Sequence, residues 1–164
     1  MQESGTLTVT TPSDREVMFT RSFNAPRRLV WEAWTKPELL QKWLHGWDGW
    51  RLEVRENDLR PGGAIRWVWR GSGGEEMGLR GVYREIVPPE RIVHTEIFDE
   101  DWTGGETLVT LLLTERGGRT TTTMTVLYAS REARDGALKT GMTEGMEVGY
   151  ERLERLLASM GGEA

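Results

Sequence analysis

The residues most able to do chemistry lie in the segment ERIVHTEIF, residues 90–98. Alternate side chains of a β-strand share a face, so His94 and Glu96 would point to the same side, about 7 Å apart along the strand. In a dry cavity such a pair could move a proton, because burial raises the pKa of a carboxyl group and an imidazole titrates near neutral pH. His94 and Glu96 are therefore the candidate acid–base pair.

The opposite orientation of this strand is also compatible with the sequence. Val93, Thr95 and Ile97 would then face the interior, and His94 and Glu96 would lie in water. Both faces of the strand alternate equally well, so periodicity does not choose between them. Of the two arrangements we expect the solvated one.

Other reaction chemistries have no counterpart in the sequence. The chain has no cysteine, which excludes disulfides, thiol catalysis and thiolate metal sites. It has no phosphate-binding glycine loop, dinucleotide fingerprint, zinc-protease motif or nucleophile elbow. His45 is a lone loop histidine, and without a cluster of carboxylates a metal site shared with His94 is not expected. We therefore expect neither a metal nor a cofactor.

Aromatic side chains supply the candidate walls of a binding site. The chain has 8 tryptophans, mostly in its first half, and such large rings usually line a core or a pocket. In AIRWVWRG, residues 64–71, Trp67 and Trp69 share a face with Ile65 and are the best candidates to face a cavity. Alternatively, they cap the core against a helix or lie on the outer face.

The segment MGLRGVYREIV, residues 77–87, leaves its inward face undecided. Tyr83 lies on one face and Arg84 on the other. The face of Tyr83 suits the interior better, because arginines on a convex face are simply solvated. The Tyr83 hydroxyl would then be offered to a ligand, although periodicity alone does not decide this.

The longest predicted element runs from Ser130 to about Met160. Ser130 is a good N-cap, apolar residues recur at helical spacing, and Gly161 ends the pattern. One helix of nearly thirty residues is therefore expected, well above the usual ~11–12. The charged residues of its second half are expected to form a solvated face: Glu151, Arg152, Glu154 and Arg155.

Glycines four residues apart form a stripe along this helix: Gly141, Gly145 and Gly149. A helical glycine costs roughly 1 kcal/mol relative to alanine, so the stripe must serve a tertiary purpose. One purpose is close packing of the helix backbone against a sheet. The other is a hollow whose wall includes the adaptable side chains of Met142 and Met146.

The other segments predict the elements that surround this helix. Residues 1–15 predict a polar tail, with a possible short strand at 6–10, and residues 16–22 predict the first strand. Two short helices follow, NAPRRLVWEAW and PELLQKWL, and then about six alternating segments joined by tight turns. The fold class is therefore α+β, with a curved antiparallel sheet of about six to seven strands wrapped around a long C-terminal helix.

Length and composition limit the function classes. A chain of 164 residues most simply forms one domain, placed at residues 16–160 after the tail. The net charge of -5 argues against a nucleic-acid partner. No stretch approaches the ~18 consecutive apolar residues of a membrane span, and the polar N-terminus is no signal peptide. A cytoplasmic protein is expected.

Three blocks of the sequence are similar to a known family. RSFNAPRRLVWEAWTKPELLQKWL, ENDLRPGG and RGVYREIVPPERIV, in this order, resemble the SRPBCC (START-like) superfamily. The resemblance is to the branch of the activator of heat-shock-protein-90 ATPase homologues, and it covers residues 16–158. It implies a helix-grip fold, in which the sheet and the long helix enclose a deep, mostly apolar cavity with its mouth near the short helices.

The loop after the second short helix departs from this family. Trp43-Leu44-His45-Gly46 stands where the family has Trp-Trp-Gly-Pro. Because this loop lies near the expected mouth, the ligand preference of relatives does not transfer. The family name comes from a co-chaperone that carries this domain beside another one, for which 164 residues leave no room.

Three functions are compatible with these observations. The first, which we expect, is binding of a small apolar or aromatic ligand by a monomer or homodimer. Its predicted ligand-binding residues are Trp67, Trp69, Tyr83, Phe98, Met142, Gly145 and Met146. The second is a cofactor-free enzyme of the cyclase or hydratase kind known in the superfamily, with His94 and Glu96 as its acid–base pair. The third is a chaperone-linked interaction, which would need an exposed apolar patch.

Overall fold

The alternating segments form one open antiparallel sheet in a computed structural model that describes residues 6–100 and 104–161. The strands are β1 Thr8–Thr10, β2 Glu16–Phe23, β3 Arg51–Asn57, β4 Ala64–Arg70, β5 Glu76–Val87, β6 Arg91–Phe98, β7 Thr107–Arg116 and β8 Arg119–Leu127. Their order in the sheet is β1-β2-β8-β7-β6-β5-β4-β3. The predicted α+β class is confirmed, and the sheet has 8 strands because the possible strand of the tail is present as β1.

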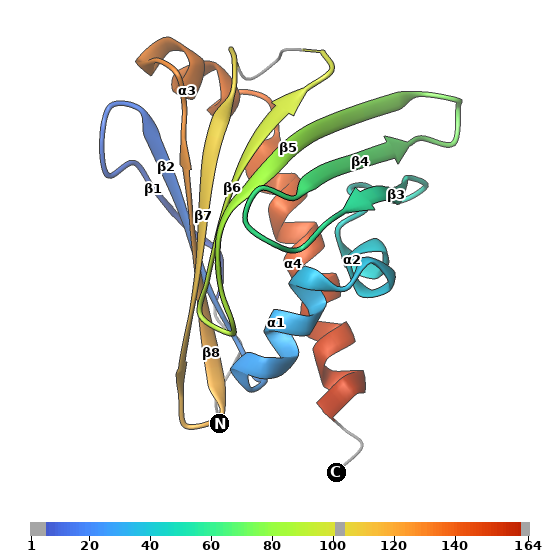
Figure 1. Cartoon of the computed structure of the whole chain (residues 1–164), viewed down its shortest axis with the longest axis vertical. Coiled ribbons are helices and arrows are strands. Elements are labelled where there is room, and N and C mark those ends of the chain that lie inside the picture. Colours follow the sequence, from blue (N-terminus) through green and yellow to red (C-terminus); the bar gives the residue numbers. More distant parts are fainter. Residues whose placement is uncertain (1–5, 101–103, 162–164) are drawn as a thin grey trace.

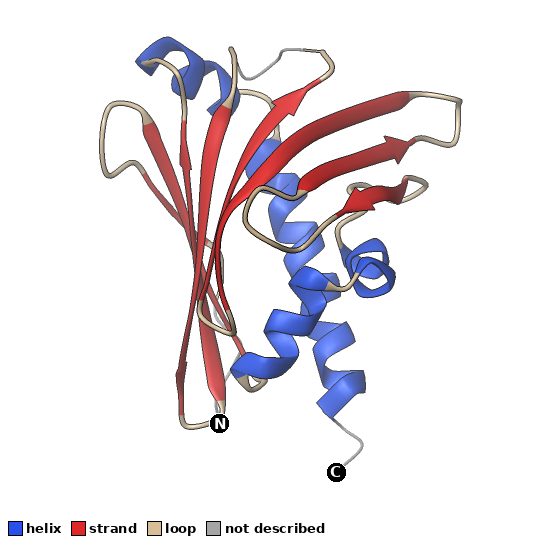
Figure 2. Cartoon of the chain, viewed as in Figure 1, coloured by secondary structure: helices blue, strands red, loops and turns tan. Residues whose placement is uncertain are grey.

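The helices of the described residues are α1 Arg27–Thr35, α2 Pro37–Trp43, α3 Arg131–Leu138 and α4 Met142–Gly161. The sheet curves around α4, and α1 and α2 lie on the same side of the sheet as α4 (Figure 1). The helix α3 lies at one end of the sheet (Figure 2). None of these helices is both long and apolar enough to cross a membrane. Of the eight tryptophans, Trp102 is outside the described residues.

The predicted long C-terminal helix is confirmed as α4, but the prediction that one helix runs from Ser130 to about Met160 is wrong. Ser130 does cap α3, since its Oγ accepts a hydrogen bond from the backbone N–H of Ala133 at 3.0 Å. The chain then leaves the helical conformation before α4, because Gly141 has a φ of 82°. Such a left-handed backbone cannot continue a right-handed helix, and glycine adopts it without a steric penalty. The break lets α3 and α4 take separate positions.

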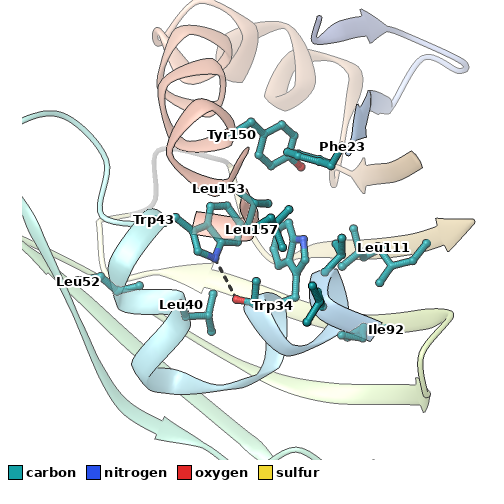
Figure 3. Close-up of a cluster of buried hydrophobic side chains, with 14 of the residues drawn as sticks. Phe23, Trp34, Leu40, Trp43, Leu52, Ile92, Leu111, Tyr150, Leu153 and Leu157 are labelled. Atoms are coloured by element: carbon teal, nitrogen blue, oxygen red, sulfur yellow. Dashed lines mark hydrogen bonds between the residues drawn. The ribbon is translucent and has the colours of Figure 1, made fainter. Parts of the chain in front are cut away.

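The main core lies where α4 meets α1, α2 and the inner face of the sheet. Trp43 is fully buried at its centre, and its Nε1–H donates a hydrogen bond to the carbonyl oxygen of Ala33 at 2.9 Å (Figure 3). The rings of Trp34 and Trp43 meet edge to face with centroids 4.7 Å apart. Tyr150 of α4 packs against Trp43 and, edge to face, against Phe23. This aromatic contact fixes the position of α4 against α2 and β2.

Charged residues in the second half of α4 also anchor this helix, so the predicted solvated face is wrong in part. Arg21 of β2 and Glu154 form an ion pair of 2.8 Å in which the side chains are only 9% and 22% exposed. The backbone N–H of Asn24 donates a further hydrogen bond to Glu154. A partly buried, charge-assisted hydrogen bond is stronger than a surface ion pair, so it holds α4 to the sheet.

All 3 tyrosines of the chain are buried, which predicts a sharp loss of stability in alkali. Burial raises the pKa of Tyr83 to about 12, against a weaker opposing effect of the hydrogen bond with Asn57. Burial, and secondly the negative charge of Glu96, raises the pKa of Tyr128 to about 12. Burial also raises the pKa of Tyr150.

An unfolded tyrosine ionises near pH ~10, so the folded state favours the neutral phenols. Their contribution to stability is complete below about pH 10 and is lost as the pH rises toward 12. We therefore expect tyrosinate absorbance and loss of the circular-dichroism signal to appear together in an alkaline titration. Reversible ionisation near pH ~10 in the intact fold would contradict this prediction.

Candidate functional site

A pocket of about 210 Å³, here called the inner pocket, lies between α4 and the inner face of the sheet. Its wall is mostly aromatic and sulfur-containing, and its residues are Trp34, Trp43, Leu44, Gly46, Trp67, Trp69, His94, Glu96, Met124, Met142, Gly145, Met146, Gly149 and Tyr150. Strands β4 and β6 contribute one side of this wall, and α4 contributes the other. Such a concave, mainly apolar site with few polar groups is typical of small-molecule sites.

A second, more open pocket of about 450 Å³ adjoins it and is called the outer pocket. Its residues are His45, Gly46, Trp47, Trp50, Trp69, Met77, Thr140, Gly141, Met142 and Gly145. The two pockets share four residues, which are Gly46, Trp69, Met142 and Gly145. The outer pocket is therefore the mouth of the inner one, bounded by the loop after α2 and by the break between α3 and α4.

Five of the predicted ligand-binding residues line the inner pocket. Trp67 and Trp69 come from β4, and their rings meet edge to face with centroids 6.3 Å apart. Met142, Gly145 and Met146 come from the first two turns of α4. The alternation of β4 thus places both tryptophans on one side of the inner pocket, and the helical spacing of α4 places its three residues on the other side. Their binding of a ligand stays a prediction.

Tyr83 and Phe98 are not among the side chains that line the inner pocket. Tyr83 is buried in the core, and its hydroxyl donates a hydrogen bond to Oδ1 of Asn57 at 2.8 Å, so it is not free for a ligand. A β-bulge between Tyr83 and Glu85 shifts the alternation of β5, which explains why periodicity did not decide the face of this strand. Phe98 stacks on Trp69 with centroids 6.3 Å apart.

His94 and Glu96 both face the inner pocket, so the expectation that they lie in water is wrong. Nε2 of His94 is 2.9 Å from Oε2 of Glu96, and the side chains are 8% and 19% exposed. Their positions are about 7 Å apart along β6, and the two side chains bend toward each other to form this contact. They stay inward because β6 lies between β5 and β7 in the middle of the sheet, where its inner face meets the rings of Trp67 and Tyr83.

The hydrogen bond with Glu96 restricts which nitrogen of His94 can carry a proton. With an ionised carboxylate, which only accepts, Nε2–H is the donor, and a neutral ring then has its lone pair on Nδ1. Nδ1 of His94 and Nε1 of Trp34 are buried and have no hydrogen-bond partner among the described residues. Both residues also line a small cavity of about 10 Å³. One water molecule there could accept from Trp34 and donate to His94.

The glycine stripe has two different roles, and neither is packing against the sheet. A Cβ atom at Gly149 would lie 3.5 Å from the carbonyl oxygen of Trp43, in ordinary van der Waals contact, so Gly149 lies against the end of α2. A Cβ atom at Gly145 would meet nothing closer than Cζ2 of Trp47, at 3.9 Å. Gly145 therefore leaves open space where the inner and outer pockets meet, as the hollow interpretation predicts.

Arg152 of α4 fastens the loop that forms the mouth, although the sequence predicted it to be solvated. Its guanidinium donates hydrogen bonds to the carbonyl oxygen of Gly46 and, at 2.9 Å, to Oδ1 of Asp48. The arginine side chain is only 11% exposed. Burial, and secondly the charge of Arg152, lowers the pKa of His45 in the same loop.

Replacing Arg152 with glutamine is expected to loosen this loop. Loss of the two charge-assisted hydrogen bonds should cost about 1.5–3 kcal/mol and speed amide exchange at residues 45–50. The pKa of His45 should rise toward its ordinary value, because one of the two causes that lower it is gone. Hydrogen-exchange mass spectrometry and NMR titration of His45 measure both effects. Arg155→Gln is the matched control, since Arg155 lies exposed on the same helix and should change neither.

Sequence reasoning missed several residues of the inner pocket: Trp34, Trp43, Met124 and Tyr150. Two signals could have indicated them. Tyr150 stands four residues after Met146 and so continues the same helix face. Met124 is the one large apolar residue in the threonine run of β8, on the face of the buried residue Thr122. Trp34 and Trp43 required knowledge of how α1 and α2 pack on α4.

Comparisons with known proteins agree on the fold. A family model described as "Activator of Hsp90 ATPase homolog 1-like protein" matches residues 24–158. A solved structure of a protein from Rhodobacter sphaeroides is 39% identical, with a TM-score of 0.88 over 94% of this chain and 99% of that one.

Two further solved structures are more distant in sequence. For a protein from Mycobacterium smegmatis the identity is 27% and the TM-score 0.80, over 92% of this chain and 96% of that one. A protein from Arthrobacter aurescens is 23% identical, with a TM-score of 0.83 over 93% and 91% of the two chains, and shows the fold alone. None of the curated proteins matches the chain.

Proposed function

Because the chain belongs to the family of activator of Hsp90 ATPase homolog 1-like proteins, a branch of the SRPBCC (START-like) superfamily, we propose that it binds a small apolar or aromatic molecule between the sheet and α4. The observation that carries the proposal is the inner pocket together with the outer pocket, which shares four of its lining residues. Trp67 and Trp69 offer flat ring surfaces on one side, and Met142 and Met146 offer adaptable thioethers on the other.

Native mass spectrometry of the purified protein is the direct test. A stoichiometric small molecule that is released on denaturation would support the proposal and identify the ligand class. Tryptophan fluorescence against a panel of apolar probes is the second measurement, because Trp67 and Trp69 line the inner pocket. Bare protein whose fluorescence no probe changes would contradict ligand binding.

A second candidate function is a cofactor-free enzyme, and the geometry of His94 and Glu96 favours it. The pair lines the inner pocket, and Nε2 of His94 is 2.9 Å from Oε2 of Glu96. Glu96 could therefore accept a proton from the ligand while the imidazole of His94 holds the carboxylate in position. The test is conversion of the identified ligand, followed by mass spectrometry. His94→Ala should abolish conversion and still bind the ligand if the protein is an enzyme. If wild-type protein does not convert the ligand, the enzyme function is wrong and only the binding function remains.

The chaperone-linked interaction has less support. Exposed large apolar side chains among the described residues are separated along the chain: Trp47, Leu59, Val82 and Val87. Trp47 is accounted for as part of the mouth of the pocket. An interaction surface would need a contiguous patch of several hundred Å². A cytoplasmic location and the oligomeric state stay predictions from the sequence.

A further inference from the structure

The wall of the inner pocket is mainly apolar, and its few charged or titratable side chains do not include a basic lysine or arginine. Among the described residues that line it there is one carboxylate, Glu96, and one imidazole, His94, but no lysine or arginine. The outer pocket adds only His45 to the titratable groups. The nearby cation of Arg152 is already paired with Asp48 at 2.9 Å. Among the described residues that line the two pockets, a ligand anion would therefore find no lysine or arginine.

Glu96 keeps one oxygen available for a ligand. Its Oε2 is taken by Nε2 of His94, and its Oε1 has no hydrogen-bond partner among the described residues. The side chain is 19% exposed at the pocket wall. With a neutral imidazole the pair carries one negative charge, and with a protonated imidazole it carries none. In neither state does the pair present a net positive charge to a ligand.

The rings around Glu96 favour the same kind of ligand. The faces of tryptophan rings attract cations, and Trp67 and Trp69 line the same pocket as the carboxylate. A buried cation without a partner is costly, but a carboxylate together with aromatic faces offsets that cost. A charge-assisted hydrogen bond is also roughly twice as strong as one between neutral groups.

We propose that the pocket selects organic cations: an aromatic body carrying one protonated amine that donates to Oε1 of Glu96. This inference rests on the proposed binding function and specifies its ligand class. The aromatic body would lie between β4 and α4, where Trp69 and Met146 face the inner pocket from opposite sides. Carboxylates and phosphates of the same size would be excluded, because Glu96 repels them and no arginine or lysine is among the described residues of the pocket wall.

Three probes with one aromatic body and different charges test the proposal. Naphthylmethylamine is a cation, naphthylmethanol a neutral hydrogen-bond donor, and naphthoate an anion. By isothermal titration calorimetry the amine should bind at least about tenfold more tightly than the alcohol, and the alcohol more tightly than the anion. In Glu96→Gln the amine should lose at least about tenfold in affinity, while the alcohol changes by less than about threefold. Glu85→Gln, an exposed carboxylate on β5, is the control and should leave the order unchanged.

The outcomes separate this inference from the binding function. If wild-type protein binds all three probes equally, or if Glu96→Gln keeps the preference for the amine, the selection of cations is wrong and the binding function stands. If no probe binds, the inference is also overturned, and the native mass spectrum decides the binding function independently. Should Glu96→Gln fail to fold, the order of the three affinities in wild-type protein still decides.

Discussion

Replacing Gly145 with leucine is expected to abolish most ligand binding while the fold stays intact. A Cβ atom at Gly145 would lie 3.9 Å from its nearest neighbour, Cζ2 of Trp47, and so fits without a clash. Because this residue lines both pockets, the rest of the new side chain would occupy the passage between them. A ligand ring that loses its buried position forfeits about 1.5–3 kcal/mol. Calorimetry with naphthylmethanol should therefore show a loss of affinity between roughly tenfold and a hundredfold.

The same substitution is expected to raise stability. It removes a helical glycine, which costs roughly 1 kcal/mol relative to a good helix former. Gly136→Leu in α3 is the matched control, because a Cβ atom there meets nothing within 4 Å and the residue lines neither pocket. The control should share the gain in stability and keep its affinity. Equal affinity losses in both variants, or none in Gly145→Leu, would contradict the assignment of Gly145 to the passage.

Replacing Trp43 with alanine is expected to cause the largest loss of stability, about 3–5 kcal/mol in the free energy of unfolding. The side chain is fully buried, and its ring is 4.7 Å from that of Trp34 and 6.0 Å from that of Tyr150. Its removal leaves a cavity where α2 meets α4 and leaves the carbonyl oxygen of Ala33 without its hydrogen bond.

Urea unfolding followed by circular dichroism measures this loss. Trp47→Ala is the control, since Trp47 is 49% exposed and its truncation should change the free energy of unfolding by no more than about 0.5 kcal/mol. Similar losses for both tryptophans would mean that α2 is not fixed through Trp43.

The order of the elements was predictable because hydrophobic periodicity and turn residues are local signals. The break at Gly141 was not, since Leu138 and Met142 stand four apart and continue the helical spacing across it. The orientation of His94 was undecidable for another reason. Both faces of β6 carry apolar residues, Ile92 on one and Val93 on the other, because this central strand is buried on both faces.

The existence of the pocket could not be predicted from local patterns, because it depends on contacts between residues far apart in the sequence. Trp67 and Trp69 could be placed on one face of a strand, but the pocket exists only because α4 lies opposite that strand. That position depends on pairs far apart in the sequence, such as Arg21 with Glu154. Likewise the Tyr83 hydroxyl could not be assigned before Asn57 was known to lie beside it.

The strand order has a consequence for the behaviour of the chain in a crowded solution. In the described residues the open edges of the sheet are β1 and β3. An exposed edge can pair with a strand of another molecule and so start aggregation. Here β1 is only three residues long, while β3 carries Arg51, Glu53 and Arg55 and is interrupted by a bulge between Val54 and Glu56. Short length, charge and irregular pairing make both edges poor templates, so the sheet can stay open without recruiting other chains.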